Sequence, residues 1–135
     1  MTAVITVVLK NGIAAHQAGD LDRAADFYNE ILSAAPEHAD ATHLMGLVYF
    51  QRGQNDVAAT MIRAAIDLDT KVPLYHANLG RVFMASRDDA GALVAFREAV
   101  LLEPENAHLH ADLLGLGRLF EDLGLRARLA VVPGL

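Results

Sequence analysis

The chain has 135 residues, enough for one domain that buries a core without metal ions or disulfide bonds. It contains no cysteine, which excludes a disulfide framework, a thiolate metal site and a thiol nucleophile. Its formal net charge of −6 argues against nucleic acid as a partner, because phosphate binding requires a basic protein face.

The composition is apolar for a soluble protein, with a mean hydropathy of +0.26. The first apolar stretch, Val4 to Leu9, is interrupted by Thr6 and is too short to span a bilayer. It lacks the flanking features of a secretory signal, so we expect neither secretion nor membrane insertion. We therefore expect a soluble, cytoplasmic protein whose surplus apolar side chains line a groove or an open end of the fold. Arginine outnumbers lysine nine to two, which favours a bacterial source with GC-rich genes.

An internal repeat is marked by three glycines that lie 34 residues apart, at Gly12, Gly46 and Gly80. An alanine stands twelve positions after each glycine and a large apolar residue sixteen positions after it, at Ala24, Ala58 and Ala92 and at Tyr28, Ile62 and Phe96. Apolar residues three and four apart mark one face of a helix, so each period is predicted to hold two helices of about a dozen residues. Pairing of glycine with alanine would let the two helices approach closely, while the large residue fills the space beside them.

The predicted elements follow in chain order within a single domain, 1–135. The repeats are predicted at 5–38, 39–72 and 73–106. Polar breaks at Asp20, Gln54 and Asp88 supply N-cap residues for the second helix of each repeat. Gly19 and Gly53 precede two of these breaks, where a helix often ends in the left-handed conformation. Residues 107–130 match the pattern only after a shift, so we expect a capping helix or helix pair there, followed by a tail at 131–135.

The repeated segments resemble the tetratricopeptide repeat family. The segment Gly46–Gly53 and the segment Leu79–Phe83 match the first-helix signature of that family, and Ala92–Ala99 with Pro104 matches the second. The resemblance covers about residues 5 to 106. It implies an all-α, right-handed superhelical solenoid of antiparallel helix pairs, whose first helices line a concave face.

The resemblance also implies which positions face that groove. By their distance from the marker glycines they are predicted at Leu9, Ile13, His16, Gln17, His43, Leu47, Phe50, Gln51, Leu74, Arg81 and Met84. This lining is mainly apolar with a few polar groups, a character that favours an amphipathic helix or an extended apolar segment of a partner.

The groove lacks the basic residues with which some family members bind acidic chaperone C-termini. The resemblance assigns those roles to positions that are here Leu9, Ile13, Leu44, Leu74 and Asn78. None of these side chains carries the charge that holds a carboxylate, so the chain is not expected to be that kind of co-chaperone.

No catalytic or cofactor chemistry is predicted. The six histidines, His16, His38, His43, His76, His108 and His110, include no pair three or four residues apart, the spacing that puts two metal ligands on one helix face. The aspartates fall in the turns between helices, where capping accounts for them. The two serines, Ser33 and Ser86, lie in no nucleophile motif.

The sequence therefore predicts a protein–protein interaction scaffold or adaptor that is not an enzyme. Two alternatives stay open. The chain can be a self-associating structural scaffold, since its composition is apolar, its C-terminal cap is weak and its start is rich in the β-branched residues Val4, Ile5, Val7 and Val8. It can also be the N-terminal recruiting region of a larger bacterial transferase, because the run Ala39–Gly46 resembles repeats that precede glycosyltransferases and sulfotransferases. Nothing in the sequence identifies the partner.

Overall fold

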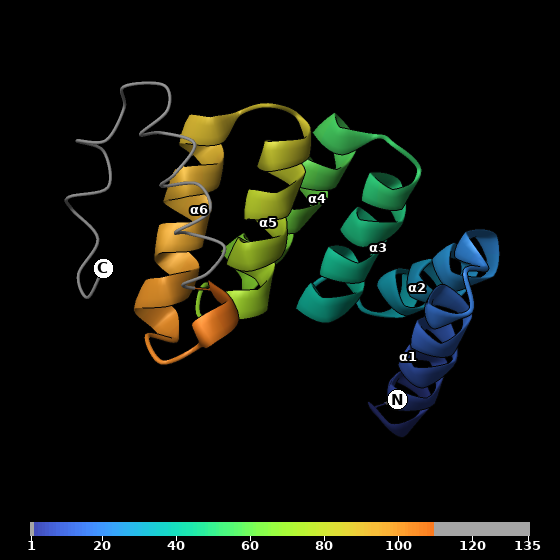
Figure 1. Ribbon diagram of the computed structural model, residues 1–135. Helices are drawn as coiled ribbons and strands as arrows, with labels where there is room; N and C mark the ends of the chain where they lie inside the picture. Colours follow the sequence, from blue (N-terminus) through green and yellow to red (C-terminus); the bar gives the residue numbers. More distant parts are fainter. Residues whose placement is uncertain (1, 110–135) are drawn as a thin grey trace. The chain divides into compact units, whose positions relative to one another are not determined.

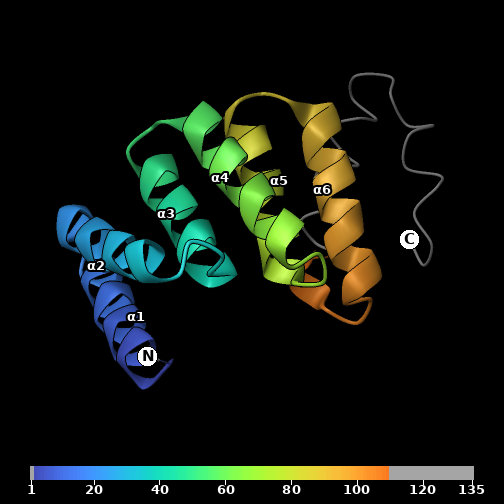
Figure 2. The same ribbon diagram turned by 180° about the vertical axis from the view of Figure 1, so that it is seen from behind.

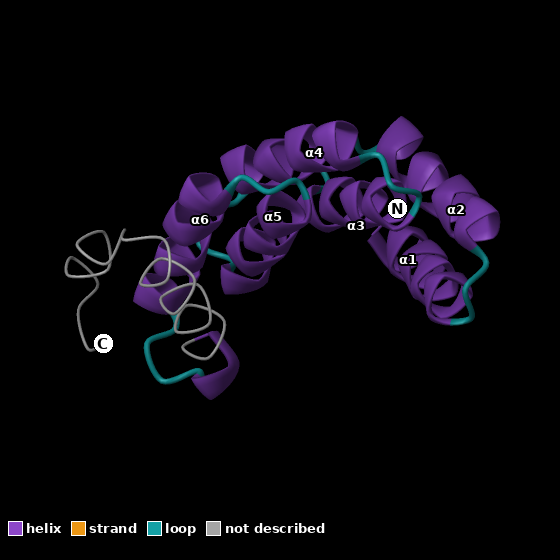
Figure 3. Ribbon diagram, turned by 45° about the horizontal axis from the view of Figure 1, so that its top comes forward, coloured by secondary structure: helices purple, strands orange, loops and turns teal. Residues whose placement is uncertain are grey.

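The computed structural model describes residues 2–109 of the chain, with Thr2 described by its backbone alone. Within this range the structure is helical and contains no strand (Figures 1 and 3). The helices are α1 (Thr2–Gln17), α2 (Leu21–Ala34), α3 (Ala39–Gln51), α4 (Asn55–Leu68), α5 (Pro73–Ala85) and α6 (Asp89–Leu102), and a further helical turn covers 107–109. The prediction of an all-α fold is confirmed. The rest of the predicted capping segment and the tail at 131–135 lie outside the described residues.

The helices fall into two compact units. Unit 1 spans Met1–Thr70 and holds α1 to α4, while unit 2 spans Lys71–Leu135 and holds α5 and α6. In unit 1, α1 packs on α2, α2 on α3, and α3 on α4, and in unit 2 α5 packs on α6 (Figures 1 and 2). The two helices of each predicted repeat therefore form one hairpin. No helix in the described part of the chain combines the length and the apolar character required to cross a bilayer.

Each hairpin is closed by a contact between its marker glycine and the large residue sixteen positions later. A methyl group on Gly12 would lie 2.6 Å from Cε1 of Tyr28, and one on Gly46 would lie 2.8 Å from Cγ1 of Ile62. At Gly80 the methyl group would lie 2.8 Å from the Phe96 ring. The glycine thus makes room for the large side chain, and at Gly46 a methyl group would also lie 3.3 Å from the backbone oxygen of Ala58, the alanine that the sequence pattern pairs with it.

Local signals place the helix ends where the sequence predicts them. The Asp20 and Asp88 carboxylates accept hydrogen bonds from the backbone N–H groups of Arg23 and Gly91, at 3.1 and 2.9 Å. Gln54 is the N-cap residue of α4 but makes no side-chain cap hydrogen bond.

The turn before each second helix places one residue in the left-handed conformation. Gly19 and Gly53 adopt it with φ of 82° and 78°, as predicted. In the third repeat Arg87 adopts it, with φ of 60°, so a non-glycine residue carries the backbone strain of that turn.

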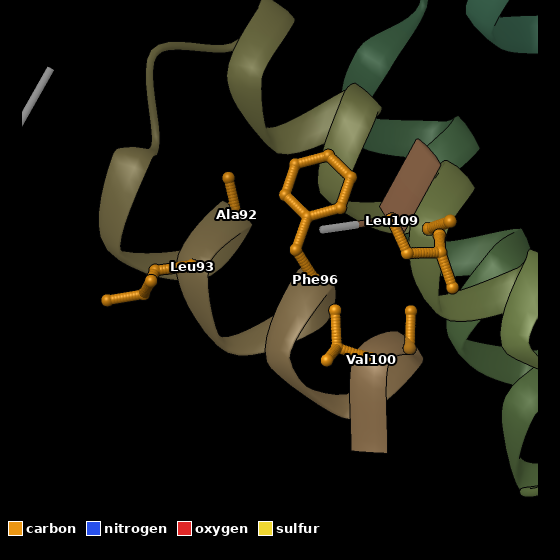
Figure 4. Packing of buried hydrophobic residues seen from close by; sticks show 7 residues of the cluster. Ala92, Leu93, Phe96, Val100 and Leu109 are labelled. Carbon is orange, nitrogen blue, oxygen red and sulfur yellow. The ribbon is translucent and has the colours of Figure 1, made fainter. Parts of the chain in front are cut away.

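The large residue of each hairpin also organises the core of its unit. In unit 1 the buried cluster joins Ala24, Ala25 and Tyr28 of α2 to Met45 and Val48 of α3. In unit 2 Phe96 lies among Ala92, Leu93 and Val100 of its own helix, and Leu109 turns toward it from the following segment (Figure 4). Leu109 is only 5% exposed, so this first turn of the segment after α6 belongs to the core of unit 2.

We predict that Gly46→Ala destabilises the protein. An alanine in the middle of a helix would ordinarily stabilise it by about 1 kcal/mol. Here the new methyl group would overlap Ile62, and overpacking of this kind costs about 1–3 kcal/mol. Denaturant unfolding followed by circular dichroism measures the change. In an Ile62→Ala background the same substitution should cost less, because Cγ1 of residue 62 is then absent. An equal cost in both backgrounds would show that the contact is not the cause.

Candidate functional site

The groove positions predicted in unit 1 lie on α1 and α3, the first helices of their hairpins. Leu47 and Phe50 are partly exposed, and Gln51, one turn after Leu47, is exposed. Because residues three and four apart share a helix face, these three side chains form one surface on α3. The same surface of α1 carries Leu9, Ile13, His16 and Gln17, the first three partly buried and the last exposed. Leu9 also packs against the core cluster of unit 1.

A chain of hydrogen bonds links the two first helices through His16. The His16 ring lies between Tyr28 of α2, whose hydroxyl is 2.9 Å from Nδ1, and Gln51 of α3, whose Oε1 contacts Nε2. An amide oxygen can only accept, so Nε2–H donates to Gln51 and, in the neutral ring, Nδ1 accepts from Tyr28. Burial raises the pKa of Tyr28 to about 12, which keeps its hydroxyl proton in place for this bond. His16 therefore fixes Gln51 and connects the first repeat to the second.

His43, which the sequence predicts as a groove residue, is buried. Only 2% of the residue is exposed. The physical reason is that α3 packs on α2 along one side and on α4 along another, which leaves a narrower exposed strip than the repeat pattern implies. Burial lowers the pKa of His43 to about 4, outweighing the smaller opposite effect of the Asp40 carboxylate. His43 is therefore a neutral, buried side chain near pH 7.

The groove positions predicted in unit 2 lie on α5, and two of the three border a hollow of about 260 Å³. Leu74 and Arg81 line it together with Ala77, one helical face of α5. Met84 is 43% exposed, as a ligand-contacting residue must be, but it is not among the residues that line this hollow. The guanidinium of Arg81 donates a hydrogen bond of 2.8 Å to Oδ1 of Asn78, one turn earlier.

The opposite wall of this hollow comes from residues that the sequence reasoning did not select. They follow α6 and are Glu103, Asn106, His108 and Leu109, and Pro73 completes the lining. Oδ1 of Asn106 accepts hydrogen bonds from the backbone N–H groups of His108 and Leu109, at 3.0 and 3.2 Å. The spacing of Asn106 before an apolar residue is a capping signal that could have located this wall from the sequence.

Both surfaces combine apolar side chains with a few polar ones. In unit 2, Leu74, Ala77 and Leu109 are apolar, while Arg81 and Glu103 bring one charge of each sign. A volume of 260 Å³ lies below the usual range for small-molecule sites, so the hollow suits one or two side chains of a larger ligand. Among residues 2–109 no three metal-ligating side chains come together.

Comparison with known proteins assigns the chain to a family. Residues 15–82, half of the chain, match the family described as Tetratricopeptide repeat. The chain belongs to the tetratricopeptide repeat family, a family of protein-interaction repeats, and its predicted membership is confirmed.

Relatives and solved structures agree with this assignment. The human protein named Tetratricopeptide repeat protein 7B is 29% identical over 97 residues, which are 72% of this chain and 12% of the relative. The O-GlcNAc transferase of Thermobaculum terrenum, solved as a mutant, is 30% identical with a TM-score of 0.81, and the match covers 86% of this chain and 22% of that one. The first repeat domain of Spaghetti (RPAP3), solved with an HSP90 peptide, is 20% identical with a TM-score of 0.80, covering 87% and 93%.

We predict that protonation of His43 destabilises the folded protein. Because its pKa is about 4 in the folded state and 6.5 in the unfolded state, only the unfolded state binds the proton between these values. The free energy of unfolding should therefore be independent of His43 above pH 6.5 and fall by up to about 3 kcal/mol as the pH falls to 4.

The measurement is denaturant unfolding at several pH values for the wild type and for His43→Gln. Other groups titrate equally in both proteins, so the difference between their unfolding free energies isolates the histidine. This difference should be constant above pH 6.5. Below pH 6.5 the unfolding free energy of the wild type should fall relative to that of His43→Gln. A difference that stays constant down to pH 4 would show that His43 is accessible to protons in the folded state.

Proposed function

We propose that the chain is an adaptor module that binds an apolar segment of a partner protein across the surface formed by α1 and α3 in unit 1. The observation that carries this proposal is the partial exposure of Leu47 and Phe50 beside the exposed amide of Gln51. Leu47 and Phe50 each retain exposed apolar surface that a bound ligand would cover. The Gln51 amide, held by His16, can donate to a backbone carbonyl of the ligand.

Affinity in the micromolar range is expected from these contacts. Burial of each apolar anchor side chain contributes about 1.5–3 kcal/mol before ordering costs are subtracted. Three such anchors near the upper end of this range reach the roughly 8 kcal/mol of a complex with a Kd of about 1 µM, and only if the surface is already ordered. The hydrogen bonds of His16 to Tyr28 and Gln51 support that order, because they hold α1, α2 and α3 together without the ligand.

The expected ligand is apolar rather than acidic. The peptide in the Spaghetti (RPAP3) structure, SRMEEVD, carries three acidic residues. In this chain the positions that the family resemblance assigns to carboxylate binding include Leu9, Ile13 and Leu44. An amphipathic helix with apolar residues at helical spacing, or an extended apolar segment, matches such a lining better. Taken by itself, the unit 2 hollow beside Leu74 and Arg81 can accept an apolar side chain with a polar neighbour.

We predict that Phe50→Glu abolishes ligand binding while the fold persists. The probe is a peptide selected on the purified protein from a displayed library of amphipathic helices, and its Kd is measured by fluorescence anisotropy. Phe50→Glu should raise this Kd by at least about 30-fold, because the new charge would lose its hydration on binding. The circular dichroism spectrum and the melting temperature should change little.

Val57→Glu is the matched control. Val57 lies on α4 and is 42% exposed, so the substitution places the same charge on the other helix of the hairpin. It should leave the Kd unchanged. Amide chemical shifts of the wild type should change on peptide addition around Leu47, Phe50 and Gln51. Shift changes confined to α2 and α4, or a large loss of stability in Phe50→Glu, would contradict the proposal.

A second candidate function is recruitment of substrates or partners for a larger enzyme. The observation in its favour is the match to the Thermobaculum terrenum O-GlcNAc transferase, which is 30% identical to 86% of this chain. In this arrangement the repeats bind a protein while chemistry takes place in another domain, so no catalytic residue is expected within the repeats. Sequencing the gene on both sides of the segment tests this candidate: a transferase domain in the same reading frame supports it, and stop codons bounding the segment contradict it.

A further inference from the structure

The outward side of α1 exposes apolar side chains along its whole length. Val4, Val7, Asn11, Ala14 and Ala18 recur at intervals of three and four residues, so they lie along one side of the helix, here called the outer stripe. All five are exposed, and the exposed fractions of Val4 and Val7 are 61% and 56%. By the same helical periodicity, Leu9 and His16 lie on the other side of α1. The outer stripe is therefore separate from the proposed ligand surface.

The second repeat uses the same positions for helix packing. The residues 34 positions after Val7, Asn11 and Ala14 are Ala41, Met45 and Val48, and the exposed fractions of these three are 0%, 3% and 0%. Met45 and Val48 belong to the cluster in which α3 packs on α2. The outer stripe thus occupies a position at which this repeat packs against a neighbouring helix, and within unit 1 no helix covers it.

The two halves of the outer stripe differ in shape. Its first half carries the two valines, whereas its second half borders a hollow of about 370 Å³. This hollow is lined by Asn11, Ala14, Ala15, Ala18, Asp20, Arg23 and Phe27. Asn11 stands midway, seven residues from Val4 and seven from Ala18. If a second copy of the stripe runs antiparallel to the first, the valine half of each copy lies against the hollow half of the other.

We propose that the outer stripe is the interface of a homodimer in which α1 packs antiparallel against α1 of a second copy, with the two-fold axis at Asn11. Val4 and Val7 of each copy then enter the hollow beside Ala14 and Ala18 of the other, so the interface uses the same residues twice. The amide of Asn11 contains both a donor and an acceptor, and the two copies of Asn11 hydrogen-bond to each other on the axis. This pair fixes the register, because a shift of the two helices would place each amide against apolar side chains without a hydrogen-bond partner.

The charge distribution does not oppose a second copy at this surface. The chain carries a formal net charge of −6, yet the outer stripe has no charged residue and Lys10 is the only lysine, arginine or carboxylate side chain in α1. Two acidic chains therefore meet here without direct repulsion. At the rim of the hollow, Asp20 and Arg23 bring charges of opposite sign.

The expected dimer is reversible. A helix of 16 residues is about 24 Å long, so the interface lies at the small end of those that hold specific complexes. A Kd of about 10 µM is the corresponding expectation. The dimer should form without any ligand and should persist in Phe50→Glu, because Phe50 lies outside the outer stripe.

Sedimentation equilibrium of the full chain tests the proposal between about 1 and 200 µM protein. The wild type should dimerise, and Val7→Glu should raise the Kd by at least about 30-fold, because two carboxylates would enter the apolar interface. Val94→Glu is the matched control, since Val94 is 55% exposed on α6, and it should leave the Kd unchanged. Melting temperatures of both variants should stay close to that of the wild type.

A disulfide crosslink tests the position of the axis. The chain has no cysteine, so Asn11→Cys introduces a single thiol that would face its own counterpart in the dimer. Under mild oxidation this variant should form a covalent dimer faster than Asn29→Cys, whose substituted position is exposed on α2. A monomer at all concentrations, a dimer that Val7→Glu does not weaken, or equal crosslinking of the two variants would overturn the proposal.

Discussion

The closing of each helix hairpin depends on one steric constraint: the first helix must carry no side chain where the large residue of the second helix meets it. A methyl group on Gly12, Gly46 or Gly80 would lie only 2.6 to 2.8 Å from the opposing side chain. Two non-bonded carbon atoms do not approach so closely. Because this contact recurs every 34 residues, three hairpins of the same geometry follow one another. The directions of all other side chains on α1, α3 and α5 follow from it.

In unit 1 the constraint also positions the polar link between hairpins. Tyr28 is the large residue that packs against Gly12, and its hydroxyl bonds to His16, one turn further along α1. His16 in turn bonds to Gln51 of α3. Tyr28 therefore closes the first hairpin with its ring and, through its hydroxyl, supports the order of the proposed ligand surface. This is why we regard the surface of α1 and α3 as formed before any ligand arrives.

The sequence predicted the helices because their causes are local. Glycine spacing, helical periodicity and capping aspartates act within one repeat, and each can be recognised from residues close in the chain. The burial of His43 could not be predicted in the same way, since it results from α2 and α4 packing on α3 together. The same holds for the wall of the unit 2 hollow, where Asn106 and Leu109 follow α6 and meet residues of α5. A single-repeat pattern contains no information on how much of a first helix the neighbouring hairpins cover.

The positions proposed to face a ligand differ from the packing positions in how they vary between repeats. At the packing positions the residue class is kept, glycine opposite Tyr28, Ile62 or Phe96. At the surface positions the residue class changes from repeat to repeat. Equivalent positions of the three repeats hold His16, Phe50 and Met84 in one case and Ile13, Leu47 and Arg81 in another. Side chains at the second set do not close a hairpin, so an exchange there alters the chemistry of the surface at little cost in stability. The residues that would select a partner are therefore those that the repeat pattern does not fix. For this reason the sequence reveals the fold but not the ligand.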